Sequence, residues 1–255
     1  MILKGKRIAI FNVANKKSIA WAIAQSVVRY GGEVIIGYQN ERFKENVEEL
    51  VKDLSPKPLV LECDVSSDER IEEAKRIIER ETGKIDGLVH SIAFAPTEAL
   101  KSPFIETNRE AFRIALEVSV YSFVAMSRIF KDIINPGGSI ITLTYYGSEK
   151  VIPNYNVMGV AKSALESSVR YLAYDLGKDN IRVNAISPGP LSTLAARGIS
   201  GFVDMLQLHR ERSPLKRNIE HREVGDTAVF LLSSLSSGIT GETIYVDAGY
   251  NIMGM

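Results

Sequence analysis

The sequence predicts an α/β fold built on a single doubly wound parallel sheet of about seven strands, with helices on both faces. Short runs rich in β-branched residues alternate with longer amphipathic stretches almost to the C-terminus. Most of these short runs are apolar throughout, which is typical of strands that are covered on both faces. No linker rich in proline, glycine or serine and no internal repeat divides the 255 residues. We therefore expect one domain that spans residues 1–255.

The order of the elements along the chain gives the expected topology. Seven runs are predicted strands, at residues 7–11, 33–38, 58–63, 87–91, 139–144, 182–186 and 243–246. Six stretches with helical periodicity accompany them, at residues 18–30, 42–54, 68–81, 109–134, 155–177 and 223–233. Right-handed crossovers then make this a doubly wound, Rossmann-like sheet, which binds its ligand at the carboxyl ends of the strands.

Composition and charge narrow the class of protein. Hydrophobic residues make up 45% of the chain and charged residues 24%, as in ordinary globular proteins. The 31 basic and 31 acidic residues cancel, so charge gives no argument for binding nucleic acid or a membrane. The N-terminus carries no signal-peptide pattern, and no apolar run approaches the roughly 20 residues of a membrane span. We expect a soluble, cytoplasmic protein without a nucleic-acid or membrane partner.

One segment interrupts the alternation of strands and helices. After the predicted strand 182–186 comes Ser187-Pro188-Gly189-Pro190, followed by a loosely amphipathic helical piece within residues 192–214. An insertion that leaves the carboxyl end of a strand is well placed to cover a bound substrate. We interpret residues 192–214 as a lid, and the alternative is a helix that packs elsewhere on the surface.

The turn after the first strand is the expected position of a dinucleotide pyrophosphate. Residues 11–22 contain no glycine, so the G-x-G-x-x-G pattern is absent. A helix beginning at Ser18 nevertheless follows the turn, and the free N–H groups and the dipole of a helix start attract a phosphate. Asn12 tolerates a positive φ better than most residues, and Ala22 is the smallest replacement for a glycine at a close contact between helix and strand. The alternative is an ordinary capped turn without a ligand.

The ends of the next three strands reach the same edge of the sheet. The second strand ends near Gln39, where an acidic residue would select NAD and an arginine would accommodate NADP. Because no cation stands at this strand tip, we favour NADH. The third strand ends in Cys63-Asp64-Val65, and we interpret Cys63 as a small buried hydrophobe, with a reactive thiol as the alternative. The fourth ends at His90, which we interpret as a core residue, with a catalytic base as the alternative.

A tyrosine and a lysine seven residues apart form the clearest catalytic pattern. Tyr155 and Lys162 lie at the start of the predicted helix 155–177. Seven residues are close to two helical turns, so both side chains would project from one face. A phenol beside an ammonium can donate a hydrogen bond to a developing oxyanion, while the cation lowers the pKa of the phenol. This pairing suits the reduction of a carbonyl-conjugated substrate.

Several segments together resemble one family. They are Asp64-Val65, His90-Ser91-Ile92-Ala93-Phe94-Ala95-Pro96, and residues 145–162, 184–190, 193–196 and 241–247. From the first strand to the C-terminus the chain is similar to the NADH-type enoyl-acyl-carrier-protein reductases of bacterial type II fatty-acid synthesis. This family is a divergent branch of the short-chain dehydrogenase/reductase superfamily. A Tyr-x6-Lys spacing with a second tyrosine ten residues upstream is specific to the branch, whereas most of the superfamily uses Tyr-x-x-x-Lys.

The resemblance implies an oxidoreductase that reduces the trans-2 double bond of enoyl thioesters during fatty-acid elongation. It also implies an acyl carrier protein as the partner that carries the substrate, a homotetramer, and no metal. The catalytic positions are Tyr145, Tyr155 and Lys162, and the substrate contact is Ala95. The cofactor-binding positions are Asn12, Ser18, Ile19, Gln39, Asp64, Val65, Ile92, Lys162, Leu191, Ser192, Thr193, Leu194 and Ala195.

The chain departs from the family pattern at three positions where the family usually has glycine, namely Asn12, Ala22 and Ala93. We expect these departures to weaken or alter cofactor affinity without abolishing function. They also leave open a non-catalytic nicotinamide-binding sensor. A separate alternative is a carbonyl-reducing relative, such as a 3-oxoacyl thioester reductase, against which the seven-residue spacing and Tyr145 argue.

Two further tyrosine–lysine pairs match Tyr-x-x-x-Lys. The pair Tyr146 and Lys150 crosses a glycine corner, without a helix to align its side chains. The pair Tyr174 and Lys178 lies at the far end of the predicted helix, which puts Tyr174 roughly 28 Å from Tyr155. We interpret both pairs as incidental.

Overall fold

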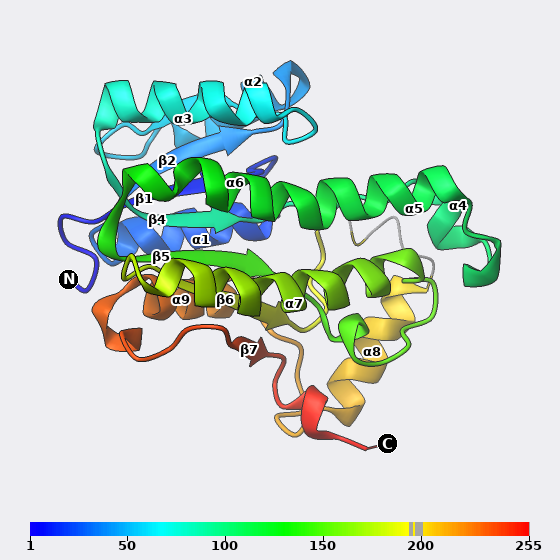
Figure 1. Ribbon diagram of the computed structural model, residues 1–255. Coiled ribbons are helices and arrows are strands. Elements are labelled where there is room, and N and C mark those ends of the chain that lie inside the picture. The colour runs from blue at the N-terminus through cyan, green and yellow to red at the C-terminus, as the bar shows by residue number, and fades with distance from the viewer. Residues whose placement is uncertain (194–195, 197–200, 255) are drawn as a thin grey trace.

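The computed structural model describes residues 1–193, 196 and 201–254, and its described strands form one parallel sheet (Figure 1). The strand order is β3-β2-β1-β4-β5-β6-β7, and every neighbouring pair is parallel. The strands are β1 (Arg7–Phe11), β2 (Glu33–Tyr38), β3 (Leu59–Glu62), β4 (Ile85–His90), β5 (Ile134–Leu143), β6 (Arg182–Pro188) and β7 (Thr243–Val246). The predicted doubly wound parallel sheet is confirmed.

Helices cover both faces of the sheet, as the apolar strands require. One hydrophobic core lies between the sheet and the helices α1 (Ile19–Arg29), α2 (Glu41–Val51) and α9 (His221–Leu232). A second core lies under α3 (Asp68–Thr82), α6 (Ser122–Phe130) and α7 (Val157–Gly177). In Figure 1, α6 and α7 cross in front of the sheet, and α1 and α9 are seen behind it. Cys63 belongs to the second core, and burial raises the pKa of its thiol to about 12.

The strand order reverses between β1 and β4. After β3 the chain crosses to the other side of β1, so β1 pairs with β2 on one side and with β4 on the other. Phe11 and His90 are the last register partners of β1 and β4, and both strands end there. A crevice opens at such a switch point because the connections leave the two strands in opposite directions.

The predicted single helix 109–134 is wrong in detail. The structure has α5 (Arg109–Leu116), a π-helical turn (Glu117–Tyr121), α6 and a 3-10 turn (Lys131–Ile133), and β5 begins at Ile134. Ser119 in the π-helical turn contacts the loop after β4. The Ser119 hydroxyl accepts a hydrogen bond from the Phe94 N–H at 3.0 Å. The short helix α4 (Thr97–Lys101), which periodicity did not predict, follows that loop. The π-helical turn thus coincides with a contact across the fold, and such contacts leave no trace in local periodicity.

Helix α8 (Phe202–Arg212) follows β6 and lies within the helical piece predicted for residues 192–214. None of the helices in the described ranges is both long enough and apolar enough to span a membrane. In the same part of the chain, no three histidine, cysteine, aspartate or glutamate side chains are grouped so that they could hold a metal ion.

Candidate active site

Tyr155 lies two residues before α7, so the prediction that one helix carries both Tyr155 and Lys162 is wrong. Helix α7 begins at Val157, because Asn156 holds a positive φ of 43° that a right-handed helix does not allow. The Asn156 side-chain amide donates to the carbonyl oxygen of Ser102 at 2.8 Å, which fixes this turn to the segment after α4. A turn anchored by hydrogen bonds therefore positions Tyr155 at the carboxyl edge of the sheet.

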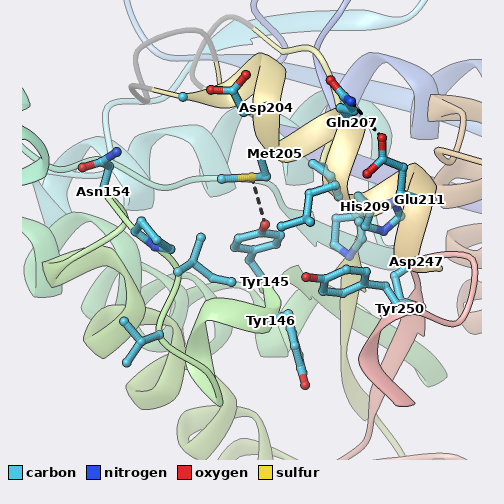
Figure 2. Close-up of a pocket in the computed structure, with 18 of the residues that line it drawn as sticks. Tyr145, Tyr146, Asn154, Asp204, Met205, Gln207, His209, Glu211, Asp247 and Tyr250 are labelled. Atoms are coloured by element: carbon cyan, nitrogen blue, oxygen red, sulfur yellow. Dashed lines mark hydrogen bonds between the residues drawn. The ribbon is translucent and has the colours of Figure 1, made fainter. Parts of the chain in front are cut away.

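Tyr155 and Tyr145 form an aromatic pair at this edge. Their ring centroids are 5.0 Å apart at an interplanar angle of 72°, an edge-to-face arrangement. The Tyr145 hydroxyl donates to the sulfur of Met205 at 3.3 Å, the contact drawn as a dashed line in Figure 2. Burial raises the pKa of Tyr145 to about 12, and burial, with Tyr145 as a second cause, raises the pKa of Tyr155. The expectation that Lys162 lowers the pKa of Tyr155 is therefore wrong: both phenols keep their protons and can donate.

Lys162 is buried inside the first turns of α7. Its side chain is 5% exposed, and its Nζ donates to the carbonyl oxygen of Leu143, the last residue of β5, at 2.7 Å. Burial lowers the pKa of Lys162 to about 8, and the negative charge of Glu166 acts in the opposite direction. An ammonium with one hydrogen bond to a carbonyl still has two donors for other groups.

The turn after β1 contains no glycine, but it still adopts the left-handed backbone conformation that glycine favours. Asn12 adopts a φ of 71°, and its side-chain amide donates to the Ser91 carbonyl oxygen at 2.7 Å. This bond joins the ends of β1 and β4 at the switch point. Ser18 caps α1: its hydroxyl accepts from the Trp21 N–H at 3.3 Å, and the half-buried Ile19 opens the helix. The N-terminus of an 11-residue helix therefore faces this turn, as a pyrophosphate site requires.

The ends of β2 and β3 lie along the same edge. Gln39 is exposed directly after β2, and Asn40 caps α2 by accepting from the Arg42 N–H at 3.2 Å. The Asp64 carboxylate, just after β3, accepts from the N–H of Ser66 at 3.0 Å and from its hydroxyl at 2.8 Å. Both hydrogen bonds are made by one carboxylate oxygen, Oδ1, next to the buried Val65.

His90 is a core residue, as predicted. It is fully buried, and its two ring nitrogens lie 3.1 Å from the Thr142 hydroxyl and 2.8 Å from the Ser122 hydroxyl. Burial lowers the pKa of His90 to about 3, so the ring is neutral at neutral pH. The half-buried Ile92 and Ala95 follow it in the loop that Ser119 holds.

The segment after β6 is described in part. Leu191 is buried, and Ser192 and Thr193 are half-buried. The Thr193 hydroxyl accepts from the Ala196 N–H at 3.1 Å. The two other residues predicted to bind cofactor in this segment, Leu194 and Ala195, lie outside the described residues.

A pocket of about 600 Å³ opens between α8, the loops after β5 and β6, and the C-terminal segment. Tyr145 and Met205 line it, together with two residues that the sequence analysis missed, His209 and Tyr250 (Figure 2). The rings of His209 and Tyr250 stack with centroids 4.9 Å apart. Tyr250 could have been found, since it follows a predicted strand at the ligand-binding edge. His209 could not, because a loosely amphipathic helix does not reveal which side chain points inward.

Comparison with known proteins identifies this arrangement. A family model described as enoyl-(acyl carrier protein) reductase matches residues 13–251. The chain belongs to the enoyl-acyl-carrier-protein reductase family. It is 49% identical to the NADH-dependent enoyl-[acyl-carrier-protein] reductase FabI of Bacillus cereus, over 99% of both chains. It is 48% identical to the corresponding Aquifex aeolicus protein, over 100% of this chain and 94% of that one.

Solved structures of reductases from this family have the same fold. The Bacillus cereus enzyme, crystallised with NADP+ and an indole naphthyridinone, superimposes with a TM-score of 0.98 at 49% identity, covering 100% of this chain and 99% of that chain. The Anaplasma phagocytophilum enzyme, in complex with NAD, gives a TM-score of 0.96 at 46% identity, covering 100% of this chain and 97% of that chain.

The structure accommodates the departures from the glycines expected of the family. Asn12 adopts the positive φ itself, as described above. At Ala22, the close approach of α1 and α9 is achieved by a glycine on the other helix, because a Cβ on Gly225 would lie 2.7 Å from the Ala22 carbonyl oxygen. Ala93 is exposed, so its methyl group has room. The effect of the three residues on cofactor affinity stays a prediction.

Proposed function

We propose that the protein reduces the trans-2 double bond of enoyl thioesters with NADH, as a step of fatty-acid elongation. The observation that carries the proposal is the convergence of Tyr145, Tyr155 and Lys162 at the carboxyl edge of the sheet in a chain of this family. The spacing of Tyr155 and Lys162 favours this reaction over carbonyl reduction, for which the superfamily uses Tyr-x-x-x-Lys.

The residues at the switch point fit a nicotinamide dinucleotide. The positive φ of Asn12 leaves the turn before α1 open to a pyrophosphate, and the buried ammonium of Lys162 has donors to spare for ribose hydroxyls. The exposed Gln39 offers no cation for a 2′-phosphate, in keeping with NADH. We assign cofactor binding to these residues and to Ser18, Ile19, Asp64, Val65, Ile92 and the segment 191–195.

When held by these residues, NADH would supply a hydride to the β-carbon of the enoyl thioester, and a proton from solvent would complete the reduction at the α-carbon. Negative charge develops on the thioester oxygen during the hydride transfer, and the protonated phenol of Tyr155 donates a hydrogen bond to it. Because burial keeps the proton on this phenol, the donor is in place before the charge appears. Tyr145 lines the acyl site beside Tyr155 and orients the thioester, and Ala95 contacts the substrate from the loop after β4.

The pocket beneath α8 is the proposed site of the acyl chain. Helix α8 contributes Met205 and His209 to the pocket wall, which supports a lid formed by residues 192–214 over a single dinucleotide-binding domain of residues 1–255. A lid that closes over the thioester keeps water from the reacting atoms.

We further propose that an acyl carrier protein delivers the substrate, that the enzyme is a homotetramer and that it acts in the cytoplasm. Tyr171 and Tyr174 on α7 are 74% and 86% exposed, which is consistent with a subunit interface on this helix. Sedimentation equilibrium measures the oligomeric state directly, and a monomer would contradict this part of the proposal.

The test follows the oxidation of nicotinamide with a crotonyl thioester and, in parallel, with an acetoacetyl thioester, using NADH and NADPH separately. We expect turnover of the crotonyl thioester with NADH. Turnover of the acetoacetyl thioester alone would instead identify a carbonyl reductase. Binding of NADH without turnover of either substrate would identify a nicotinamide-binding sensor.

A further inference from the structure

Glu166 is the charged neighbour of Lys162 that the proposed mechanism leaves without a role. The two residues are four apart on α7, so their side chains lie on one face of the helix. A helical side chain leans toward the N-terminal end of its helix, which brings Glu166 over the turn that carries Lys162. Within the described residues, Glu166 is the acidic group whose charge opposes the effect of burial on the pKa of Lys162.

The end of β5 holds both members of the pair. The carbonyl oxygen of Leu143 accepts from Lys162 Nζ at 2.7 Å. The next residue, Thr144, donates its hydroxyl to Glu166 Oε1 at 2.5 Å. Thr144 is 3% exposed, and its own N–H donates to the Ile186 carbonyl oxygen at 2.9 Å, so the sheet fixes this hydroxyl. This hydrogen bond therefore holds the Glu166 carboxylate in one position, and the carboxylate does not rotate freely in solvent.

The other titratable groups around the pair carry no charge at neutral pH or are turned to solvent. Burial lowers the pKa of His90, on β4, to about 3. Glu149 is exposed and accepts a hydrogen bond from Tyr245 of β7. Four phenols on the surrounding elements have pKa values raised chiefly by burial, those of Tyr145, Tyr146, Tyr155 and Tyr245. Glu166 is thus the charged group in this surrounding that acts against the effect of burial on Lys162.

We propose that Glu166 is a positioning residue that, held by Thr144, keeps Lys162 in its ammonium form for cofactor binding. The inference rests on the proposed role of Lys162 in holding the nicotinamide ribose. Lys162 and Glu166, which are four residues apart, would then serve cofactor binding, unlike an ion pair of the same spacing on the protein surface. The carboxylate stabilises a buried positive charge that burial alone disfavours.

The direct test is a titration of Lys162 by NMR in the ligand-free chain, with 13C at lysine Cε and the signal assigned from its absence in K162R. In E166Q we expect the titration midpoint of Lys162 to fall by about one pH unit, because an opposite charge at this range shifts a pKa by that order. The conservative variant E166D should restore most of the wild-type midpoint.

Two further variants keep the test decisive if E166Q does not fold. T144V should lower the midpoint by a smaller amount in the same direction, because the released carboxylate turns to solvent. D175N removes an exposed carboxylate from the far end of the same helix and should leave the midpoint unchanged. A midpoint of Lys162 that is the same in wild type, folded E166Q and T144V would overturn the inference and leave the proposed function intact.

A second measurement separates the inference from the function on which it rests. The dissociation constant of NADH, measured by calorimetry at pH 8, should rise about fivefold in E166Q. At this pH, a midpoint one unit lower reduces the ammonium fraction of Lys162 to about one fifth of the wild-type fraction. D175N should match wild type. If K162M binds NADH as tightly as wild type, the proposed role of Lys162 fails, and the positioning role of Glu166 fails with it.

Discussion

The two edges of the sheet use polar residues in opposite ways. At the amino edge, the Asp86 carboxylate accepts from Lys6 Nζ at 3.0 Å, the Arg7 N–H at 2.9 Å and the Asn135 amide at 3.2 Å. At the carboxyl edge, Lys162 makes one hydrogen bond to the residues that the structure describes, to the Leu143 carbonyl oxygen, and its positive charge is buried. The Asp86 carboxylate at the amino edge is thus hydrogen-bonded by groups of the chain itself, whereas the Lys162 ammonium at the carboxyl edge has donors left for a ligand.

Helix α7 runs between these edges, with Tyr155 and Lys162 near its start and Tyr174 and Lys178 near its end. Lys162, in the first turns of the helix, and Tyr155, just before it, are both buried. Tyr174, near the end of the helix, is 86% exposed, and Lys178, directly after the helix, is also exposed. Both pairs fit a catalytic spacing, but one of them lies where the strands end. The position of a pair relative to the sheet therefore decides its chemistry, and the spacing alone does not.

The largest expected effect tests this difference between the two pairs. Y155F should lower kcat by about 10²- to 10³-fold, because it removes the donor that meets the charge on the thioester oxygen. Its affinity for NADH should stay close to that of wild type. Y174F removes the hydroxyl of the exposed tyrosine and should leave kcat unchanged, as measured with a crotonyl thioester. Equal rates for Y155F and wild type would contradict the assignment of the site.

The amino edge should affect stability and leave turnover alone. Burial raises the pKa of Asp86, but the hydrogen bonds from Arg7, Lys6 and Asn135 outweigh it and lower that pKa overall. The contribution of Asp86 is therefore present above its unfolded pKa of about 3.9 and is lost as the pH falls through the lower folded value. D86N should reduce the free energy of unfolding in urea at pH 7 by roughly 2 kcal/mol.

The control for this prediction is D53N, which removes an exposed carboxylate at the end of α2 and should change stability by less than about 0.5 kcal/mol. The dependence of stability on acid pH should be weaker in D86N than in D53N. Loss of kcat per folded molecule in D86N would show that the amino edge takes part in catalysis and would erase the distinction between the two edges.

The fold was predictable because strands buried on both faces are apolar throughout. The predicted bounds of β1, β2 and β7 match the structure, and the edge at which ligands bind followed from the parallel order. The π-helical turn at Ser119 was not predictable, because its partner there, the Phe94 N–H, lies in a loop 25 residues away.

The identity of the candidate site residues could be predicted from the sequence, but their surroundings could not. The sequence indicated Tyr145, Tyr155 and Lys162, but it placed Tyr155 on a helix that Asn156 prevents from starting there. It also predicted a lowered pKa for the phenol, whereas burial raises it. Burial arises when distant segments pack together, so local spacing does not report its electrostatic effect.

The smallest expected effect separates backbone strain from hydrogen bonding at the carboxyl edge. Asn12 holds a φ of 71° and bonds to Ser91 across the switch point. N12G keeps the conformation without strain and loses only the bond, whereas N12A loses the bond and also carries the strain of a left-handed alanine. In urea denaturation, N12A should therefore be about 1 kcal/mol less stable than N12G. Equal stabilities would mean that the turn relaxes to a negative φ, so the open shape at this edge would depend on asparagine itself.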